Sequence, residues 1–451
     1  MKRSFPEHWV LTELGNILYL KNGYSFKSTD YCEEGIPLVR ISDIQDGRIN
    51  LDTTVKVPNR LLKSDFIIEN GDLLIAMSGA TTGKFGIYIG NETILQNQRV
   101  GNLKLYSKSL VSTKYRDYLI ASLRDIIQKS AYGGAQPNIS PEKIHKLIIP
   151  LPPLNEQKRI VAKLDAILPK VKSARDRLEK IPAILKKFRQ SVLAAACSGR
   201  LTEDWREEYA QHTGKELPEW EEKKIFELTE KVENLNVKNI NLHDKFLYID
   251  ISSINNIKNT IETHKEYSYY EAPSRAKQII KHGDVLFSNV RVYLKNIAIV
   301  DNPVYNDQIC STGFTVLRAQ KNKLLNKYLF YSLIRDDFIK EVSELQVGSS
   351  YPAIKKDDLI SRFIPLPPLE EQHEIVRRVE KLFALADSIE EKYKKAHERL
   401  EKLEQAILAK AFRGELVEPD PNDEPAEELL KRILEEKAKL EREQRGKNRK
   451  K

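Results

Sequence analysis

The chain has 451 residues, a net charge of +9, and 31% charged residues. This length exceeds that of one ordinary domain, so two or three are expected. The excess of positive charge favours a polyanionic partner such as nucleic acid. No apolar run could span a bilayer, and the start of the chain lacks the apolar core of a signal peptide. We therefore expect a cytoplasmic protein without a membrane segment.

The first 130 residues predict a compact mixed domain. Short β-rich runs at 38–42, 72–77 and 85–89 are separated by turn-forming residues. An apolar face with helical spacing follows at 112–128. A Gly-rich loop at 132–139 then leads to a Pro-rich segment.

That Pro-rich segment opens a stretch that occurs twice, at 149–201 and 364–416. The copies begin IPLPPLNEQ and IPLPPLEEQ and keep the same offsets to their closing glycines, Gly199 and Gly414. Apolar residues follow at alternating steps of four and three, which is the heptad pattern of a coiled coil. The predicted seam consists of Ile167, Val171, Leu178, Ile181, Leu185, Phe188 and Val192 in the first copy, and Leu382, Ile389, Tyr393, Leu400, Leu403 and Ile407 in the second.

The two seams are expected to bury each other, because either helix alone would leave its seam in water. Parallel and antiparallel pairing both fit the sequence. The first seam spans roughly 38 Å at 1.5 Å per residue. Proline interrupts only the first copy, so we expect Pro169 to separate a short helix from a longer one, and Pro182 to bend or unwind the first rod.

A second mixed domain follows the first repeated stretch, and short motifs recur in it in the same order as in the first domain. Ile251 is matched to Ile41, Gly283 to Gly71, and Gly348 to Gly133; Asp307-Gln308 is matched to Asn97-Gln98. The chain is thus a tandem duplication of α+β class. Its predicted parts are a first domain at 1–148, a first helical spacer at 149–201, a second domain at 202–363, a second spacer at 364–416, and a charged helix with a basic tail at 417–451.

Two segments resemble catalytic motifs, and both fit simpler roles better. Residues 79–84 resemble a phosphate-binding loop, but the glycine spacing is short by one and Phe85 stands where Ser or Thr is required. A turn that presents Thr81, Thr82 and Lys84 fits better. Residues 301–305 resemble an amino-methyltransferase loop, but Val304 replaces its second proline, and a turn between strands is favoured.

The three cysteines lie far apart without a C-x-x-C pair, which predicts reduced thiols, and no metal-binding motif is present. Polar residues at matching places in both domains favour DNA recognition, since such side chains can contact base edges or phosphates. The first domain offers Arg40, Ser42, Gln45, Ser78, Thr81, Thr82, Lys84, Gln96, Asn97, Gln98 and Arg99. The second offers Ser252, Ser253, Asn255, Ser288, Asn289, Arg291, Lys295, Gln308, Ser311 and Thr312.

The ordered, repeated motifs resemble the specificity subunit of type I restriction-modification enzymes. They are the two IPLPPL-x-EQ openings, the closing segments 196–201 and 411–416, and the two Gly-Asp-aliphatic-Leu strands. The resemblance implies two target-recognition domains that read a split site in double-stranded DNA, held apart by an antiparallel coiled coil with pseudo-twofold symmetry. It also implies two methyltransferase subunits and restriction subunits as partners.

The resemblance further implies that this chain is not an enzyme. S-adenosylmethionine, ATP and magnesium would bind the partners, which would carry adenine methylation and ATP-dependent cleavage. The predicted length of the first seam, roughly 38 Å, is close to one DNA turn, about 34–36 Å, which would be the separation of the two half-sites. Two alternatives remain: a coiled-coil scaffold whose mixed domains bind proteins, and a self-contained methyltransferase that uses residues 301–305.

Overall fold

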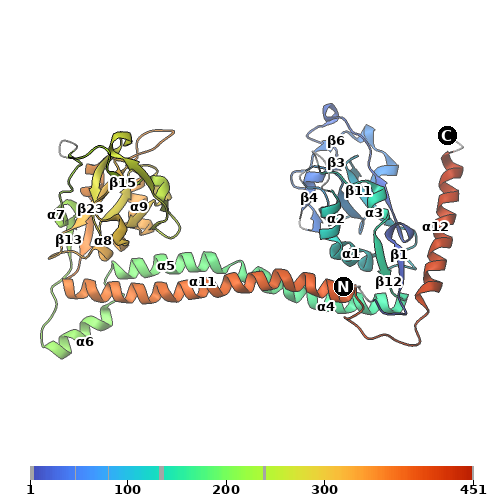
Figure 1. The fold of residues 1–451 in the computed structure, drawn as a ribbon. Helices are drawn as coiled ribbons and strands as arrows, with labels where there is room; N and C mark the ends of the chain where they lie inside the picture. The colour runs from blue at the N-terminus through green and yellow to red at the C-terminus, as the bar shows by residue number, and fades with distance from the viewer. Residues whose placement is uncertain (1–4, 46, 80, 132–136, 237–239, 449–451) are drawn as a thin grey trace. The chain divides into compact units, whose positions relative to one another are not determined.

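The structure is a computed structural model that describes residues 5–45, 47–79, 81–131, 137–236 and 240–448 (Figure 1). The chain divides into two compact units, the first formed by residues 1–178 and 396–451 and the second by residues 179–395. Helix α11 (Leu369–Ala411) contributes to both. Each unit therefore joins one mixed domain to part of both repeated stretches. Among the described residues, no helix is long and apolar enough to cross a membrane.

The first unit contains a six-stranded sheet in the order β2-β11-β8-β9-β5-β4, a four-stranded sheet in the order β6-β3-β10-β7, and the pair β1-β12. The strands predicted at 72–77 and 85–89 are confirmed as β8 and β9. The strand predicted at 38–42 is only partly correct, because β3 ends at Val39 and Ile41–Asp43 form a short 3-10 helix. The strands are β1 (Val10–Glu13), β2 (Leu18–Asn22), β3 (Ile36–Val39), β4 (Ile44–Gln45), β5 (Gly47–Ile49), β6 (Lys56–Val57), β7 (Ile67–Ile68), β8 (Leu73–Ala76), β9 (Phe85–Ile87), β10 (Ile94–Gln96), β11 (Val100–Leu105) and β12 (Ile148–Leu151).

The second unit contains two four-stranded sheets, β14-β23-β20-β21 and β18-β15-β22-β19, and the pairs β16-β17 and β13-β24. Its strands are β13 (Glu221–Lys224), β14 (Thr229–Glu230), β15 (Lys245–Ile249), β16 (Ile254–Asn255), β17 (Thr260–Ile261), β18 (Lys265–Ser268), β19 (Ala276–Ile280), β20 (Val285–Ser288), β21 (Ile297–Ile299), β22 (Gln308–Ser311), β23 (Phe314–Ala319) and β24 (Phe363–Leu366).

Strand registers repeat between the two domains. In the first, β8 pairs antiparallel with β11 and β3 pairs parallel with β10. In the second, β20 pairs antiparallel with β23 and β15 pairs parallel with β22. These registers align Gln96 with Cys310, so Asn97 corresponds to Ser311. The sequence match of Asn97-Gln98 to Asp307-Gln308 is therefore wrong, because Asp307 and Gln308 lie at the opposite end of β22.

The repeated Gly-Asp-aliphatic-Leu motif has a structural role in both domains. The buried Asp72 carboxylate accepts a hydrogen bond from Asn102 Nδ2 at 2.7 Å and lies 3.3 Å from Lys104 Nζ. Asp284 makes the matching contact, accepting two hydrogen bonds of 2.8 Å from Arg318. Burial alone would lower the pKa of Lys104, but its acidic neighbours raise it. Each aspartate thus ties the start of one buried strand to its neighbour.

The helices of the first unit enclose one large core. They are α1 (Thr113–Ser122), α2 (Arg124–Ala131), α3 (Pro141–His145), α4 (Leu154–Leu178), the end of α11, and α12 (Ala426–Asn448). The helix predicted at 112–128 is thus two helices, with the break at Leu123. Leu408 near the end of α11 and Phe412 just after it share the core with Trp9, Ile160 and Leu164. The end of the chain therefore completes the core of the N-terminal domain.

The second unit uses α5 (Ile181–Ala196), α6 (Glu203–Thr213), α7 (Ile225–Leu228), α8 (Asn326–Leu333), α9 (Asp336–Ser343), α10 (Lys356–Ile360) and the start of α11. Its helix α8 contacts β24, the strand before α11, as α1 contacts β12, the strand before α4. Tyr115 donates a hydrogen bond to the carbonyl of Pro150 at 3.1 Å, and Tyr328 donates to that of Pro365 at 2.8 Å.

Ion pairs at the same interface repeat as well. Lys114 pairs with Asp165 on α4 in the first unit, while Lys327 pairs with Glu380 on α11 in the second. The duplication therefore includes the contacts that hold each domain against its repeated helix.

The two prolines of the first copy behave differently. Helix α4 ends at Leu178 and α5 begins at Ile181, so the interruption expected near Pro182 is confirmed. Pro182 occupies the first turn of α5, where a backbone donor is not needed. The expected separation at Pro169 is wrong, because α4 continues through it. Pro169 is exposed, and the buried Leu164 and Val171 on either side hold the helix in place.

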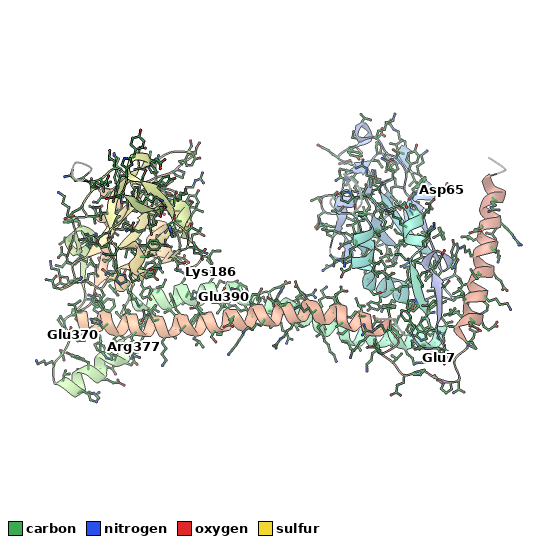
Figure 2. All side chains as sticks on the ribbon, in the orientation of Figure 1. Glu7, Asp65, Lys186, Glu370, Arg377 and Glu390 are labelled. Carbon is green, nitrogen blue, oxygen red and sulfur yellow. The ribbon has the colours of Figure 1, made fainter. Side chains whose placement is uncertain are left out.

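The predicted seam residues are only partly buried. Val171, Leu185 and Val192 are buried, whereas Ile389 is 38% exposed and Leu403 43% exposed. In the second unit, Figure 2 shows charged side chains such as Lys186, Glu390 and Arg377 along α5 and the start of α11. The remaining predicted positions are half-buried: Ile167, Leu178, Ile181, Phe188, Leu382, Tyr393, Leu400 and Ile407.

The predicted C-terminal helix is confirmed as α12, and it packs on the first unit rather than standing free. Leu429 and Ile433 are buried in the core of that unit, and the helix runs beside β1 (Figure 1). Lys437 Nζ donates to the carbonyl of Gly15 at 2.9 Å. The last residues of the basic tail, 449–451, lie outside the described part of the chain.

Candidate nucleic-acid interface

Three loops of the first domain come together where β3, β8 and β10 end. Thr81 Oγ1 donates to the carbonyl of Ile41 at 3.3 Å, which joins the β8–β9 loop to the loop after β3. The amide of Met77 donates to the carbonyl of Arg99, and that of Asn97 to Val39. The sequence candidates of this domain therefore form one loop cluster, although they are spread over sixty residues of sequence.

The candidates within this cluster divide into supporting and exposed side chains. Thr82 is buried and donates to the carbonyls of Gly79 at 2.6 Å and Pro137 at 3.1 Å, so it holds the turn instead of facing outward. Gln96 and Asn97 are also buried. Arg40, Ser78 and Thr81 are half-buried, and the exposed candidates are Ser42, Gln45, Lys84, Gln98 and Arg99.

The second domain builds the equivalent cluster from the loops after β15, β20 and β22. The amide of Asn289 donates to the carbonyl of Gly313 at 2.9 Å. The amide of Arg291 donates to Pro352 at 2.7 Å, and that of Ile354 to Asn289 at 2.9 Å. A fourth segment, 346–354, is thereby joined to the three loops.

Several second-domain candidates are used inside the fold. Ser253, Ser288 and Ser311 are buried, and each hydroxyl bonds to a nearby backbone group. Asn255 and Asn289 are half-buried; Asn255 donates to Glu262, and Asn289 accepts from Thr315. The exposed candidates are Ser252 and Thr312, and Arg291 is half-buried.

Lys295 and Gln308 have other partners. Lys295 Nζ donates to the carbonyl of Ile334 at 2.9 Å and pairs with Asp336, so it braces α9. Gln308 lies at the start of β22, at the far end of the strand from Ser311, and accepts a hydrogen bond from the amide of Leu247 at 2.7 Å. The structure therefore does not bring Gln308 to the loop cluster.

Charge distinguishes the two clusters. Lys84 and Arg99 are exposed in the first, whereas Arg40 is half-buried with its Nε 3.7 Å from the Asp43 carboxylate. In the second, the position of Arg40 is taken by Asp250, whose carboxylate pairs with Lys265 at 2.6 Å. Burial would raise the pKa of Asp250, but hydrogen bonds from Lys265 and Ser252 lower it. Of the sequence candidates, the exposed ones of the first cluster therefore include the basic side chains Lys84 and Arg99, whereas those of the second, Ser252 and Thr312, are uncharged.

Sequence reasoning missed segment 346–354 as part of the site. Tyr351 within it is 72% exposed, and the guanidinium of Arg291 lies 4.8 Å from the centre of its ring. A signal was present, because Gly348-x-x-x-Pro-x-Ile repeats the motif at Gly133. The carbonyls of both prolines accept a hydrogen bond from the loop after a buried strand. Pro137 accepts from Gly79, after β8, and Pro352 accepts from Arg291, after β20.

A family model described as the type I restriction modification DNA specificity domain matches residues 6–183 and 218–398. The chain belongs to this family. It is 31% identical to the EcoKI specificity subunit of Escherichia coli strain K12 over 96% of this chain and 97% of that protein. It is 30% identical to the EcoBI specificity subunit of Escherichia coli over 96% and 94% of the two chains.

Solved structures show the same fold. A chain from a type I R-M system superposes with a TM-score of 0.68, at 22% identity over 91% of this chain and 99% of the other. The HsdS subunit from Thermoanaerobacter tengcongensis gives a TM-score of 0.55, at 22% identity over 91% and 98%. Membership of the specificity family assigns this chain DNA sequence specificity within a type I restriction-modification complex, a non-catalytic role.

The two segments that resemble catalytic motifs are turns in this specificity chain. Asn302 caps the short helix Pro303–Tyr305 by accepting from the amide of Val304 at 3.0 Å, and Tyr305 is buried. Burial raises the pKa of the Tyr305 hydroxyl. In the loop at Gly79, Thr82 is turned inward as described above. Within the described residues, no group of three His, Cys, Asp or Glu side chains is arranged to hold a metal ion.

Proposed function

We propose that this chain reads a bipartite, asymmetric DNA site, with the domain at 1–148 on one half and the domain at 202–363 on the other. The observation that carries this proposal is the pair of equivalent loop clusters, which stand on repeated strand registers but expose different side chains. A shared scaffold with different surfaces suits two different half-sites. Lys84 and Arg99 would contact phosphates or bases in the first, and Ser252 and Thr312 bases in the second.

The repeated helices are proposed to form an antiparallel coiled coil that relates the two domains by an approximate twofold axis and sets the gap between half-sites. Contacts within each unit support this arrangement. In the first, Arg175 on α4 pairs with Glu404 on α11, while Leu164, earlier on α4, shares a core with Leu408, later on α11. In the second, Arg189 on α5 pairs with Asp387 on α11. Rising numbers on one helix meet falling numbers on the other.

The partners follow from the family role. We propose that two methyltransferase subunits and the restriction subunits assemble on this chain in the cytoplasm. S-adenosylmethionine, ATP and magnesium would bind those partners, which would carry the adenine methylation and the ATP-dependent cleavage. The parts of this chain outside the loop clusters, 149–201, 364–416 and 417–451, would serve as spacer and scaffold.

A domain exchange tests the bipartite reading. Replacing residues 6–136 by the corresponding segment of a relative should change one half of the site methylated in a host that carries the partner subunits. Sequencing of methylated positions is the readout. If both halves changed, or neither did, the proposal of two independent readers would be wrong.

A smaller change tests the loop cluster itself. Arg99→Ala should weaken binding of the full chain to its site and reduce the dependence of affinity on salt by about one counterion. Lys108→Ala is the matched control, because Lys108 is an exposed cation beyond the opposite end of β11. Equal effects of the two substitutions would show that net charge, and not this cluster, governs binding.

A further inference from the structure

One backbone position is left-handed in both domains but holds different residues. Gly79 has φ +83° and donates to Pro137, while Arg291 has φ +49° and donates to Pro352. Gly79 follows β8 and Arg291 follows β20 at the same distance in sequence, and both make the same hydrogen bond, so the two positions are equivalent. The fold requires a positive φ here, which glycine adopts freely and arginine only at a cost in free energy. Arginine in this position therefore calls for a function.

The side chain of Arg291 is used to hold Tyr351. Its guanidinium lies 4.8 Å from the centre of the tyrosine ring, at a distance typical of a cation–π contact, and donates to the carbonyl of Ser350 at 3.1 Å. Val347 and Ala353 exchange two backbone hydrogen bonds of 2.9 and 3.0 Å, which closes a narrow hairpin. Tyr351 is 72% exposed and Val347 79% exposed. The hairpin thus presents a braced aromatic ring beside the loop cluster.

The first domain does not repeat this pair in its sequence. The aligned motifs place Gln136 where the second domain has Tyr351, and Gly79 where it has Arg291. Both members of the pair are therefore absent together from one copy and present together in the other. The first domain offers exposed cations in the neighbouring loops instead, as described above.

We propose that Tyr351 stacks on a base within the second half-site, and that Arg291 is a positioning residue that fixes the ring for this contact. The inference rests on the proposed function, because it assigns a contact to the second reader. An exposed aromatic ring can stack on any base face, and side chains inserted at a base step partly unstack it. The second domain would thus add stacking to the polar contacts of its loop cluster.

Abasic scanning of the second half-site tests the proposal with the full chain. Tyr351→Gln should weaken binding roughly tenfold or more, within the range measured for base–aromatic stacking, while Tyr351→Phe should retain binding. A double-mutant cycle then compares wild type and Tyr351→Gln on duplexes with one abasic nucleotide at each position in turn. The ratio of their affinities should fall towards one at a single position and stay constant elsewhere.

Arg291→Gly separates positioning from folding. It should leave the melting temperature unchanged or raise it, because glycine relieves the positive φ, yet weaken binding several-fold and reduce the coupling at the same abasic position. Wild-type-like binding by Tyr351→Gln, or an affinity ratio that is constant at every position, would overturn the inference alone. If the wild-type chain had no preference for its site over unrelated DNA, the proposed function would fail with it.

Discussion

The repeated Glu-Gln motif has different surroundings in the two units. In the second, the buried Glu371 carboxylate accepts from Thr202 at 2.7 Å and from Trp220 at 2.8 Å, with Arg206 3.1 Å away. In the first, Glu156 Oε2 bonds to His8 at 2.8 Å, but its Oε1 has no hydrogen-bond partner among the described residues.

The closing segments of the two repeats account for one of these missing hydrogen bonds. In the alignment of those segments, the position of Thr202 is taken by Val417, which lacks a hydroxyl. Buried polar atoms that lack partners cost free energy. The duplication has thus preserved the position of the carboxylate, while its hydrogen bonds have diverged. The carboxylate of Glu371 has more hydrogen-bond donors than that of Glu156.

The largest effect expected from this comparison is that of Glu371→Ala. Its loss leaves the Trp220 indole without an acceptor and Arg206 without its counter-ion, while Thr202 keeps only a 3.4 Å bond to the carbonyl of Gly199. We therefore expect the second unit to lose about 3 kcal/mol or more. Amide hydrogen exchange in β13 and β24 would report it. Glu156→Ala is the matched control, with a smaller loss of about 1–2 kcal/mol expected in the first unit. Equal losses would contradict the comparison.

A second pair of substitutions compares the aspartates of the central strands. Asp284→Asn should destabilise the second unit by about 2–3 kcal/mol, since it breaks a buried two-bond contact with Arg318. Asp72→Asn should cost less, because Lys104 also pairs with Glu69 at 3.1 Å and keeps a counter-ion. Urea unfolding followed separately in each unit is the measurement. A larger effect at Asp72 would mean that burial outweighs the geometry of the ion pair.

A substitution can also remove the difference at the Glu-Gln motif. Val417→Thr introduces the hydroxyl that Thr202 supplies in the second unit, so the first unit should gain about 1 kcal/mol. Val417→Ala serves as the control for lost apolar contact. An unchanged unfolding free energy in Val417→Thr would show that the new hydroxyl does not reach Glu156 Oε1.

The smallest expected effect is on how the stability of the first unit depends on acid pH, through the contacts between the first domain and α4. Burial would raise the pKa of Asp165, but hydrogen bonds from Lys114 and Tyr118 lower it below its ordinary value. A lowered pKa in the folded state stabilises above the unfolded pKa, and this contribution is lost as pH falls through the folded pKa. Asp165→Asn should therefore flatten the decline in stability below about pH 4. An unchanged slope would contradict this role.

Much of the candidate site could be found from sequence, because loops that end buried strands keep their turn-forming and polar residues. Arg40, Lys84, Arg99 and Thr312 were identified in this way. Which of the polar residues turn inward could not be found, since Thr82 and Ser311 look like their exposed neighbours in composition. The inward position of Thr82 depends on the carbonyl of Pro137, which lies fifty-five residues away. Tyr351 was missed because its motif was treated as a connecting loop.

The sequence by itself determined the duplication, the repeated helices, the break near Pro182 and the family, because these depend on local order and spacing. Only the tertiary structure decided which residues share a core. Leu408, Phe412 and Leu429 complete the first domain although they lie at the other end of the chain. It also revealed the left-handed position shared by Gly79 and Arg291, because a backbone angle fixed by distant hydrogen bonds leaves no pattern in the residues around it.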